Sequence, residues 1–219
     1  MPATIKKEER NMKKIPTLFT RIFEGNKIVG ITPEITPGCE EAFHNGLATV
    51  KIDGSCCMIM RSMLYKRYDA KKGKTPPPGA IPCQPEPDPV TGHWPHWIAC
   101  DPDSKADKWY IEAFQNYCAC KGYHNITDGT YEAIGPHFQG NPYGFTYDYL
   151  YKHGEVFTHC PRTFEGVREW LTQNEEEGLV FWLNGEPVCK IKRTDFGLDW
   201  PIKEVIDWPM EEVTQNGKN

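Results

Sequence analysis

An Asn-Gly pair between two apolar runs is the feature that most restricts how this chain can fold. Residues 179–183 and 187–193 are rich in strand-forming side chains, and Asn184-Gly185 joins them. This dipeptide is the strongest short signal for a two-residue β-hairpin turn. The hairpin brings Glu177, at the start of its first strand, close to Lys190 on the second. We therefore expect a carboxylate and an ammonium group to meet on adjacent strands.

Hairpin-like strand pairs predominate in the rest of the chain. We expect further strands within residues 46–68, where Asp53-Gly54 supplies a tight turn, and at residues 97–100, 109–114 and 130–134. A helix is expected over 163–174, because Thr163 can cap it and apolar side chains follow at helical spacing. Strand pairs with few helices between them predict an α+β fold made of antiparallel sheets.

The length of 219 residues suits one domain with short tails. We expect a single domain over 16–208, a tail at 1–15 and a second tail at 209–219. Residues 74–95 are rich in proline and cannot form a helix or a central strand. They predict a long surface loop, which is either a functional lid or a plain insertion.

Lys51-Ile52-Asp53-Gly54 ends the apolar run 47–50. A lysine at this place is either a solvated side chain beside a turn or a nucleophile. An ammonium group must lose its proton before it can attack, and desolvation or nearby positive charge favours the neutral amine. Lys190 and Lys192, which share one face of their strand, can supply that charge.

Several segments that could bind a nucleotide or phosphate follow Lys51 along the chain. They are Arg67, Tyr131-Glu132-Ala133-Ile134-Gly135, Gly140-Asn141-Pro142-Tyr143-Gly144, Glu177-Gly178-Leu179-Val180, Lys190-Ile191-Lys192 and Gly197-Leu198-Asp199-Trp200-Pro201. With them the sequence resembles the ATP-dependent polynucleotide ligases and RNA-capping enzymes, which form a lysyl-NMP intermediate. Within that group it is most similar to the stand-alone vertebrate-type 5′-to-3′ RNA ligase. The resemblance extends from Lys51 to Pro201.

The resemblance implies a role for each matched residue. Lys51 is the nucleophile, Glu132 contacts the ribose hydroxyls, Glu177 positions the metal, Lys190 and Lys192 touch phosphates, and Arg67 binds a phosphate of the nucleotide or of the RNA 5′ end. Asp53 stabilises the turn, holds a hydrated magnesium ion, or does both. Phe157 stacks on the adenine; Tyr147, Tyr149 and Tyr151 are alternatives, and Phe157 could instead be a core residue.

The implied fold is a ligase-type nucleotidyltransferase domain, with two sheets and flanking helices around a nucleotide cleft. The implied reaction uses ATP as substrate and Mg²⁺ or Mn²⁺, and joins RNA 5′-phosphate and 3′-hydroxyl ends. Fewer than twenty residues follow Pro201, so we expect no appended oligonucleotide-binding barrel. This favours an RNA ligase over a DNA ligase or a GTP-dependent capping transferase. A non-catalytic nucleotide- or RNA-binding module of this fold would be expected to lose the nucleophile or a metal carboxylate.

A net charge of −5 and a pI near 5.8 argue against a protein that coats nucleic acid. Contacts with RNA must then be local, at the lysines and arginine of 66–74 or at the lysines of 6–14, unless these are merely solvated charges. Residues 1–14 lack a signal-peptide core, so the nine cysteines suggest a reducing intracellular compartment, cytoplasm or nucleus. We expect a monomer that does not span a membrane.

The cysteines and histidines suggest either metal binding or packing. His93, His96 and Cys100, and the pair Cys118 and Cys120, have zinc-like ingredients, but their spacing does not match a standard finger. Adjacent cysteines on a strand point to opposite faces. Cys56 and Cys57 are therefore expected to be packing residues.

Overall fold

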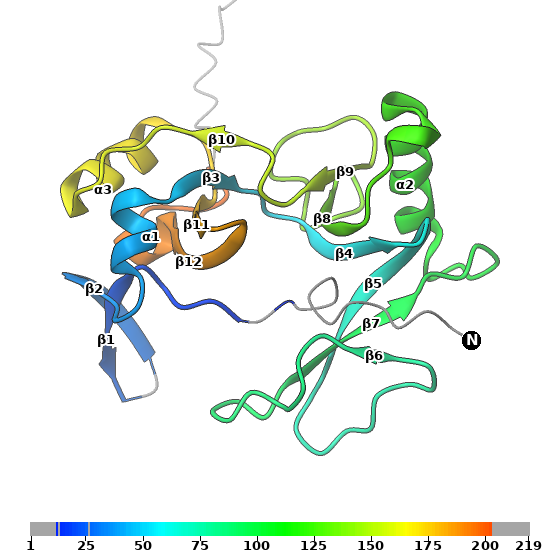
Figure 1. Ribbon diagram of the computed structural model, residues 1–219, viewed down its shortest axis with the longest axis horizontal. Coiled ribbons are helices and arrows are strands. Elements are labelled where there is room, and N and C mark those ends of the chain that lie inside the picture. Colours follow the sequence, from blue (N-terminus) through cyan, green and yellow to red (C-terminus); the bar gives the residue numbers. More distant parts are fainter. Residues whose placement is uncertain (1–11, 13, 26, 203–219) are drawn as a thin grey trace, which may run out of the picture.

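The computed structural model describes residues 12, 14–25 and 27–202, which form two β-rich halves side by side (Figure 1). Much of the expected tails, including most of the lysine run at 6–14, lies outside the described residues. The elements in chain order are β1 (Phe19–Glu24), β2 (Lys27–Ile35), α1 (Glu40–Asn45), β3 (Leu47–Lys51), β4 (Ser55–Met60), β5 (Met63–Ala70), β6 (Ile81–Pro82), β7 (Trp94–Ala99), α2 (Lys108–Lys121), η2 (Tyr123–Asn125), β8 (Gly129–Ile134), β9 (Tyr149–Lys152), β10 (Phe157–Thr158), α3 (Phe164–Gln173), β11 (Gly178–Leu183), β12 (Glu186–Lys192) and η3 (Arg193–Phe196). Mixed secondary structure with antiparallel sheets and few helices agrees with the expected α+β class.

The four-stranded half is built on a sheet of order β10-β3-β11-β12, with the β1–β2 hairpin beside it. The expected hairpin is confirmed, because β11 pairs with β12 and both turn residues have positive φ, 51° at Asn184 and 82° at Gly185. The expected helix is α3, where the Thr163 hydroxyl accepts a hydrogen bond from the Gly166 amide at 3.1 Å. Side chains of α1 and α3 share one buried core with the sheet.

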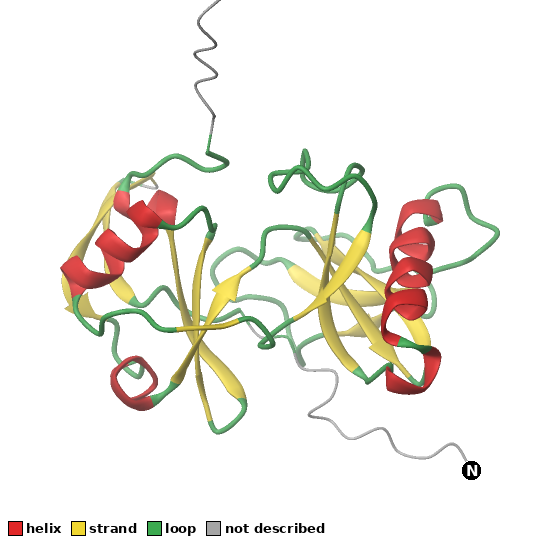
Figure 2. Ribbon diagram, turned by 90° about the horizontal axis from the view of Figure 1, so that it is seen from above, coloured by secondary structure: helices red, strands yellow, loops and turns green. Residues whose placement is uncertain are grey.

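The six-stranded half is built on a sheet of order β6-β7-β5-β4-β8-β9. Helix α2 lies on the outer side of this half (Figure 2) and buries Ala113 and Tyr117 in the core of one sheet face. The opposite face carries a second cluster that includes Met58 and Trp97. Cys57 lies in the first cluster and Cys56 packs against the second, so the expectation of opposite faces is confirmed.

Residues 52–54 do not form the expected hairpin turn. Strand β3 pairs with β10 and β11, whereas β4 pairs with β5 and β8, so this short segment crosses from one sheet to the other. Gly54 is required at the crossing, because a Cβ there would lie 2.5 Å from the Ala133 carbonyl oxygen. The tight turn of this region is Arg61-Ser62, between β4 and β5, with φ of 53° and 61°. Lys51 consequently lies at the boundary between the two halves.

The strand expected at 109–114 is wrong, because these residues belong to helix α2. Their aromatic and β-branched side chains favour a strand. The buried positions Ala113, Tyr117 and Cys118 nevertheless recur at helical spacing, and they pack against the six-stranded sheet. Gly122, with φ of 80°, follows the last turn. Packing against the sheet thus stabilises a helix in residues 109–114, although their composition favours a strand.

Two other expectations concern the proline-rich segment and membranes. Residues 74–95 are mainly a loop, apart from β6, which is the edge strand of the six-stranded sheet and pairs with β7, and the first residues of β7 itself. Among the described residues, no helix is both long and apolar enough to cross a membrane.

Candidate active site

One buried carboxylate joins three strands at the boundary of the halves. Glu177 immediately precedes β11, and the next residue, Gly178, is paired with Lys51 on β3 and with Lys192 on β12. Glu177 Oε2 contacts Lys51 Nζ, and Glu177 Oε1 contacts Lys192 Nζ. The Glu177 side chain is only 4% exposed, against 19% for Lys51 and 33% for Lys192. The carboxylate is therefore the buried centre of a lysine pair.

Gly178 lets the strands approach closely enough for these contacts. A Cβ at this position would lie 2.1 Å from the Ile191 carbonyl oxygen and 3.0 Å from the Lys192 Cα. Both atoms belong to the backbone of β12, so a side chain could not be accommodated without moving that strand. The glycine of the Glu177-Gly178 motif is thus required for the close packing of β11 against β12.

Lys190 lies two residues before Lys192 on β12 and is paired with Val180. The pKa of Lys190 is lowered to about 8, most of all by burial and then by the positive charges of Lys51 and Lys192. The negative charge of Glu177 raises the pKa of Lys190 and partly offsets these effects. The expected placement of Glu177 and Lys190 at neighbouring strands is confirmed, but the β12 lysine that contacts the Glu177 carboxylate is Lys192. Three lysines around one glutamate leave an excess of positive charge, which suits a polyanionic ligand.

Asp53 occupies the segment that crosses between the sheets. Its Oδ2 accepts a hydrogen bond from the Trp200 indole at 2.8 Å, and its backbone N–H donates to the Tyr143 hydroxyl oxygen at 2.7 Å. Burial raises the pKa of Asp53, while the hydrogen bond from Trp200 lowers it. The sequence did not indicate either aromatic partner for this carboxylate.

Glu132 and Arg67 lie on the six-stranded sheet, on the face opposite α2. Glu132 Oε1 lies 3.1 Å from His153 Nε2, and His153 Nδ1 lies 2.8 Å from the Thr130 hydroxyl. Glu132 Oε2 is buried and has no hydrogen-bond partner among the described residues. A buried polar atom without a partner is costly, so this oxygen is suited to accept a donor from a ligand.

Arg67 forms a hydrogen bond from Nε to Asp69 Oδ1 at 3.1 Å. Within the described residues, no hydrogen bond or ion pair links Arg67 or Glu132 directly to Lys51. The fold thus places the predicted site residues in two groups, one on each half, that meet through the crossing segment.

Phe157 is on β10 opposite Thr49 of β3, and its side chain is 62% exposed. A core role for Phe157 is therefore wrong. It lines a pocket of about 370 Å³ together with Leu47, His153 and Trp182. Tyr149 and Tyr151 are half-buried and in ring contact with each other, while Tyr147 is exposed. Of the aromatic candidates, only Phe157 lines this pocket.

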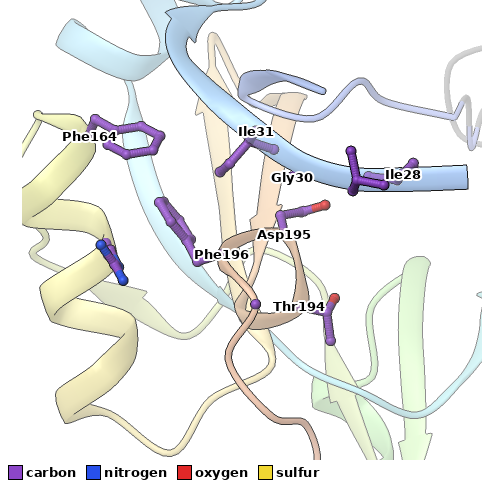
Figure 3. Close-up of a pocket in the computed structure, with 10 residues that line it drawn as sticks. Ile28, Gly30, Ile31, Phe164, Thr194, Asp195 and Phe196 are labelled. Atoms are coloured by element: carbon purple, nitrogen blue, oxygen red, sulfur yellow. The ribbon is translucent and has the colours of Figure 1, made fainter. Parts of the chain in front are cut away.

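A second pocket lies away from these residues. It measures about 350 Å³ and is formed by β2, α3 and η3, with Ile28, Ile31, Phe164 and Phe196 among its lining residues (Figure 3). None of the predicted site residues borders it.

The metal-binding potential of the site rests on oxygen ligands. The described residues contain no group of three or more His, Cys, Asp or Glu side chains that could hold a metal ion. Asp53 and Glu177 supply hard carboxylate oxygens, the type that Mg²⁺ prefers, and Mg²⁺ commonly completes its shell with phosphate oxygens and water. Both Glu177 oxygens contact ammonium groups and Asp53 Oδ2 accepts from Trp200, so Glu177 could bind a metal ion only after one of its lysine contacts is released.

The sequence has a detectable similarity to a known protein. No protein-family model matches the chain. The chain is similar to the protein named RNA ligase 1 of Rattus norvegicus, with 24% identity over 233 residues, an alignment that covers 74% of this chain and 70% of the relative.

Proposed function

We propose that this protein is an ATP-dependent RNA ligase that joins 5′-phosphate and 3′-hydroxyl ends through a lysyl-AMP intermediate. The observation that carries the proposal is the contact of Lys51 and Lys192 with the two oxygens of the buried Glu177, beside a Lys190 whose pKa is lowered. The similarity to a protein named RNA ligase 1 supports RNA as the substrate.

The first step is attack of the neutral Lys51 amine on the α-phosphorus of ATP. A nitrogen–phosphorus bond forms, the bond to the bridging oxygen breaks, and pyrophosphate leaves. Glu177 Oε2 contacts the attacking nitrogen and is positioned to accept its proton. Lys190 and Lys192 stabilise the negative charge on the phosphates.

Asp53 and Glu177 would hold the magnesium or manganese ion, with Glu177 contributing Oε1 once Lys192 has moved from that oxygen to the phosphates. When bound, the ion offsets negative charge on the transferring phosphate. Glu132 accepts hydrogen bonds from the ribose hydroxyls through its free oxygen, and Phe157 stacks on the adenine.

Two further transfers complete the reaction. The RNA 5′-phosphate attacks the lysyl-AMP phosphorus, which releases Lys51 and forms an RNA–adenylate. The 3′-hydroxyl then attacks the 5′-phosphorus, AMP leaves, and a phosphodiester bond closes the strand. Arg67, with its planar guanidinium, binds the 5′-phosphate.

Incubation with α-labelled ATP and magnesium, followed by denaturing electrophoresis, tests the proposal. Label should remain on the wild-type protein and be absent from Lys51→Arg, which keeps the positive charge but cannot act as the nucleophile. Lys71→Arg, an exposed lysine in the basic segment, is the matched control and should be labelled normally. Absence of label on the wild type, or its persistence in Lys51→Arg, would overturn the proposal. Label from GTP instead of ATP would indicate a capping-type transferase.

A further inference from the structure

Two distinctive sequence motifs have no part in the reaction described above. They are Gly140-Asn141-Pro142-Tyr143-Gly144 and Gly197-Leu198-Asp199-Trp200-Pro201. Their aromatic residues meet at Asp53, where Trp200 Nε1 donates to the carboxylate at 2.8 Å and the Tyr143 hydroxyl accepts the Asp53 amide at 2.7 Å. The two rings also lie together, with centroids 5.7 Å apart. Two separate motifs thus bind the short segment that crosses between the sheets.

Each member of this contact comes from a different part of the fold. Tyr143 belongs to the loop of residues 135–148, between β8 and β9 of the six-stranded half. Trp200 follows η3 and therefore extends from β12 of the four-stranded half. Asp53 lies in the segment that connects the two sheets, two residues after Lys51. The contact consequently ties both halves to the connection next to the proposed nucleophile.

The loop that carries Tyr143 is fixed at its tip and at its base. At the tip, Asn141 Oδ1 accepts from the Phe145 amide at 3.0 Å, and Asn141 Nδ2 donates to the Phe145 carbonyl at 2.8 Å. At the base, His137 Nδ1 lies 2.7 Å from an oxygen of the buried Asp148 carboxylate. The Tyr143 hydroxyl is therefore held in place by its own loop.

The segment that carries Trp200 is fixed as well. The buried Arg193 donates from Nε to the Asp199 carbonyl at 2.9 Å, directly before Trp200. Two partners from different halves thus meet at Asp53, and they satisfy its backbone donor and one carboxylate oxygen. Such support is what holds a reactive group in a productive geometry.

We propose that Tyr143 and Trp200 are positioning residues that join the two halves at Asp53 and so fix the strand end bearing Lys51 against the six-stranded half. The kinetic part of this inference rests on the proposed ligase function. The structural part, the coupling of Trp200 and Tyr143 to Asp53, is independent of it.

Tyr143→Phe removes the hydroxyl and keeps the ring, whereas Trp200→Phe removes the indole N–H and leaves a smaller aromatic ring. Each should slow formation of the lysyl-AMP adduct at saturating ATP about tenfold, the rate equivalent of one hydrogen bond to a charged or structurally essential group. The ATP concentration for half-maximal rate should change little, because the proposed nucleotide contacts are made by other residues. Trp170→Phe and Tyr123→Phe are the controls, since the first lies on α3 and the second is an exposed residue of η2.

A double-mutant cycle in urea tests the coupling without activity. Trp200→Phe should lower the unfolding midpoint more in the wild type than in Asp53→Ala, because the hydrogen-bond acceptor is already gone there and only the loss of ring packing remains. Additive midpoint shifts, or normal adduct rates in both Phe variants, would overturn the inference. If the wild type forms no adduct, the ligase proposal fails and the urea cycle alone decides this one.

Discussion

Lys51 and Lys192 contact opposite oxygens of the same carboxylate, that of Glu177, although 141 residues separate them in sequence. Their strands are neighbours of β11 on its two sides, so the contact follows from sheet order. A nearly fully buried carboxylate between two partly exposed lysines must be both a structural and an electrostatic centre.

Replacement of this carboxylate should therefore affect stability and activity together. In Glu177→Gln, the two ammonium groups lose their compensating charge, and we expect a loss of about 1–2 kcal/mol in the free energy of unfolding. Adduct formation should fall by about 100-fold or more. Urea unfolding and the labelled-ATP assay measure the two effects. The exposed Glu175→Gln, from the same acidic run, should change neither, and equal behaviour of the two variants would contradict this assignment.

Lys190 should make stability depend on pH. Its pKa is lowered to about 8 from 10.5, so between these values the unfolded chain binds more protons than the folded one, and the contribution of Lys190 to stability rises with pH. Lys190→Met removes the buried charge and should be about 1–2 kcal/mol more stable than wild type at pH 7. This gain should shrink as the pH rises from 8 towards 10.

Lys190→Arg is the control for that pH effect, because a guanidinium stays charged over this range. It should lose stability relative to wild type as the pH rises. Urea midpoints measured at pH 7 and pH 9.5 distinguish the variants. A constant difference between Lys190→Met and wild type at both values would show that Lys190 does not titrate as described.

Glu132 should select for ribose. Its buried Oε2 lacks a partner among the described residues, and a site built to bind hydroxyl groups rejects analogues that lack them. We expect wild-type protein to form adduct about tenfold or more faster with ATP than with 2′- or 3′-deoxy-ATP. Glu132→Ala should erase at least one of these preferences, whereas the exposed Glu155→Ala should keep both. Unchanged discrimination in Glu132→Ala would assign the carboxylate to His153 alone.

Phe157 should matter for nucleotide binding and hardly for folding. Its ring is 62% exposed, so Phe157→Ala should change the free energy of unfolding by about 0.5 kcal/mol or less. ATP affinity should nevertheless fall several-fold through loss of stacking. Phe181→Ala is the comparison variant. Phe181 is fully buried in the same sheet, so its replacement should lower the free energy of unfolding by about 3–5 kcal/mol. A large destabilisation by Phe157→Ala would return it to a structural role.

Local signals in the sequence were enough for several elements. Asn184-Gly185 specified the β11–β12 turn, because residues with positive φ are needed there, and Thr163 specified the start of α3 through its side-chain cap. The proximity of Glu177 to Lys190 followed from that hairpin alone. These features depend on residues a few positions apart, so short patterns contain the necessary information.

Features that depend on distant partners could not be obtained in this way. Asp53-Gly54 has the composition of a hairpin turn, but Gly54 packs against the Ala133 backbone and the chain passes to the other sheet. Residues 109–114 have the composition of a strand, but the sheet surface beneath them stabilises a helix. His153 had no sequence signal that linked it to Glu132.

The sequence by itself determined the chemical groups, their order along the chain and the hairpin that carries two of the lysines. Only the tertiary structure decided that Lys51 joins this hairpin through Glu177, and that Tyr143 and Trp200 converge on Asp53. The physical reason is that strand order and the packing of the two halves depend on the burial of apolar surface across the whole domain. A short segment cannot specify which distant strand will become its neighbour.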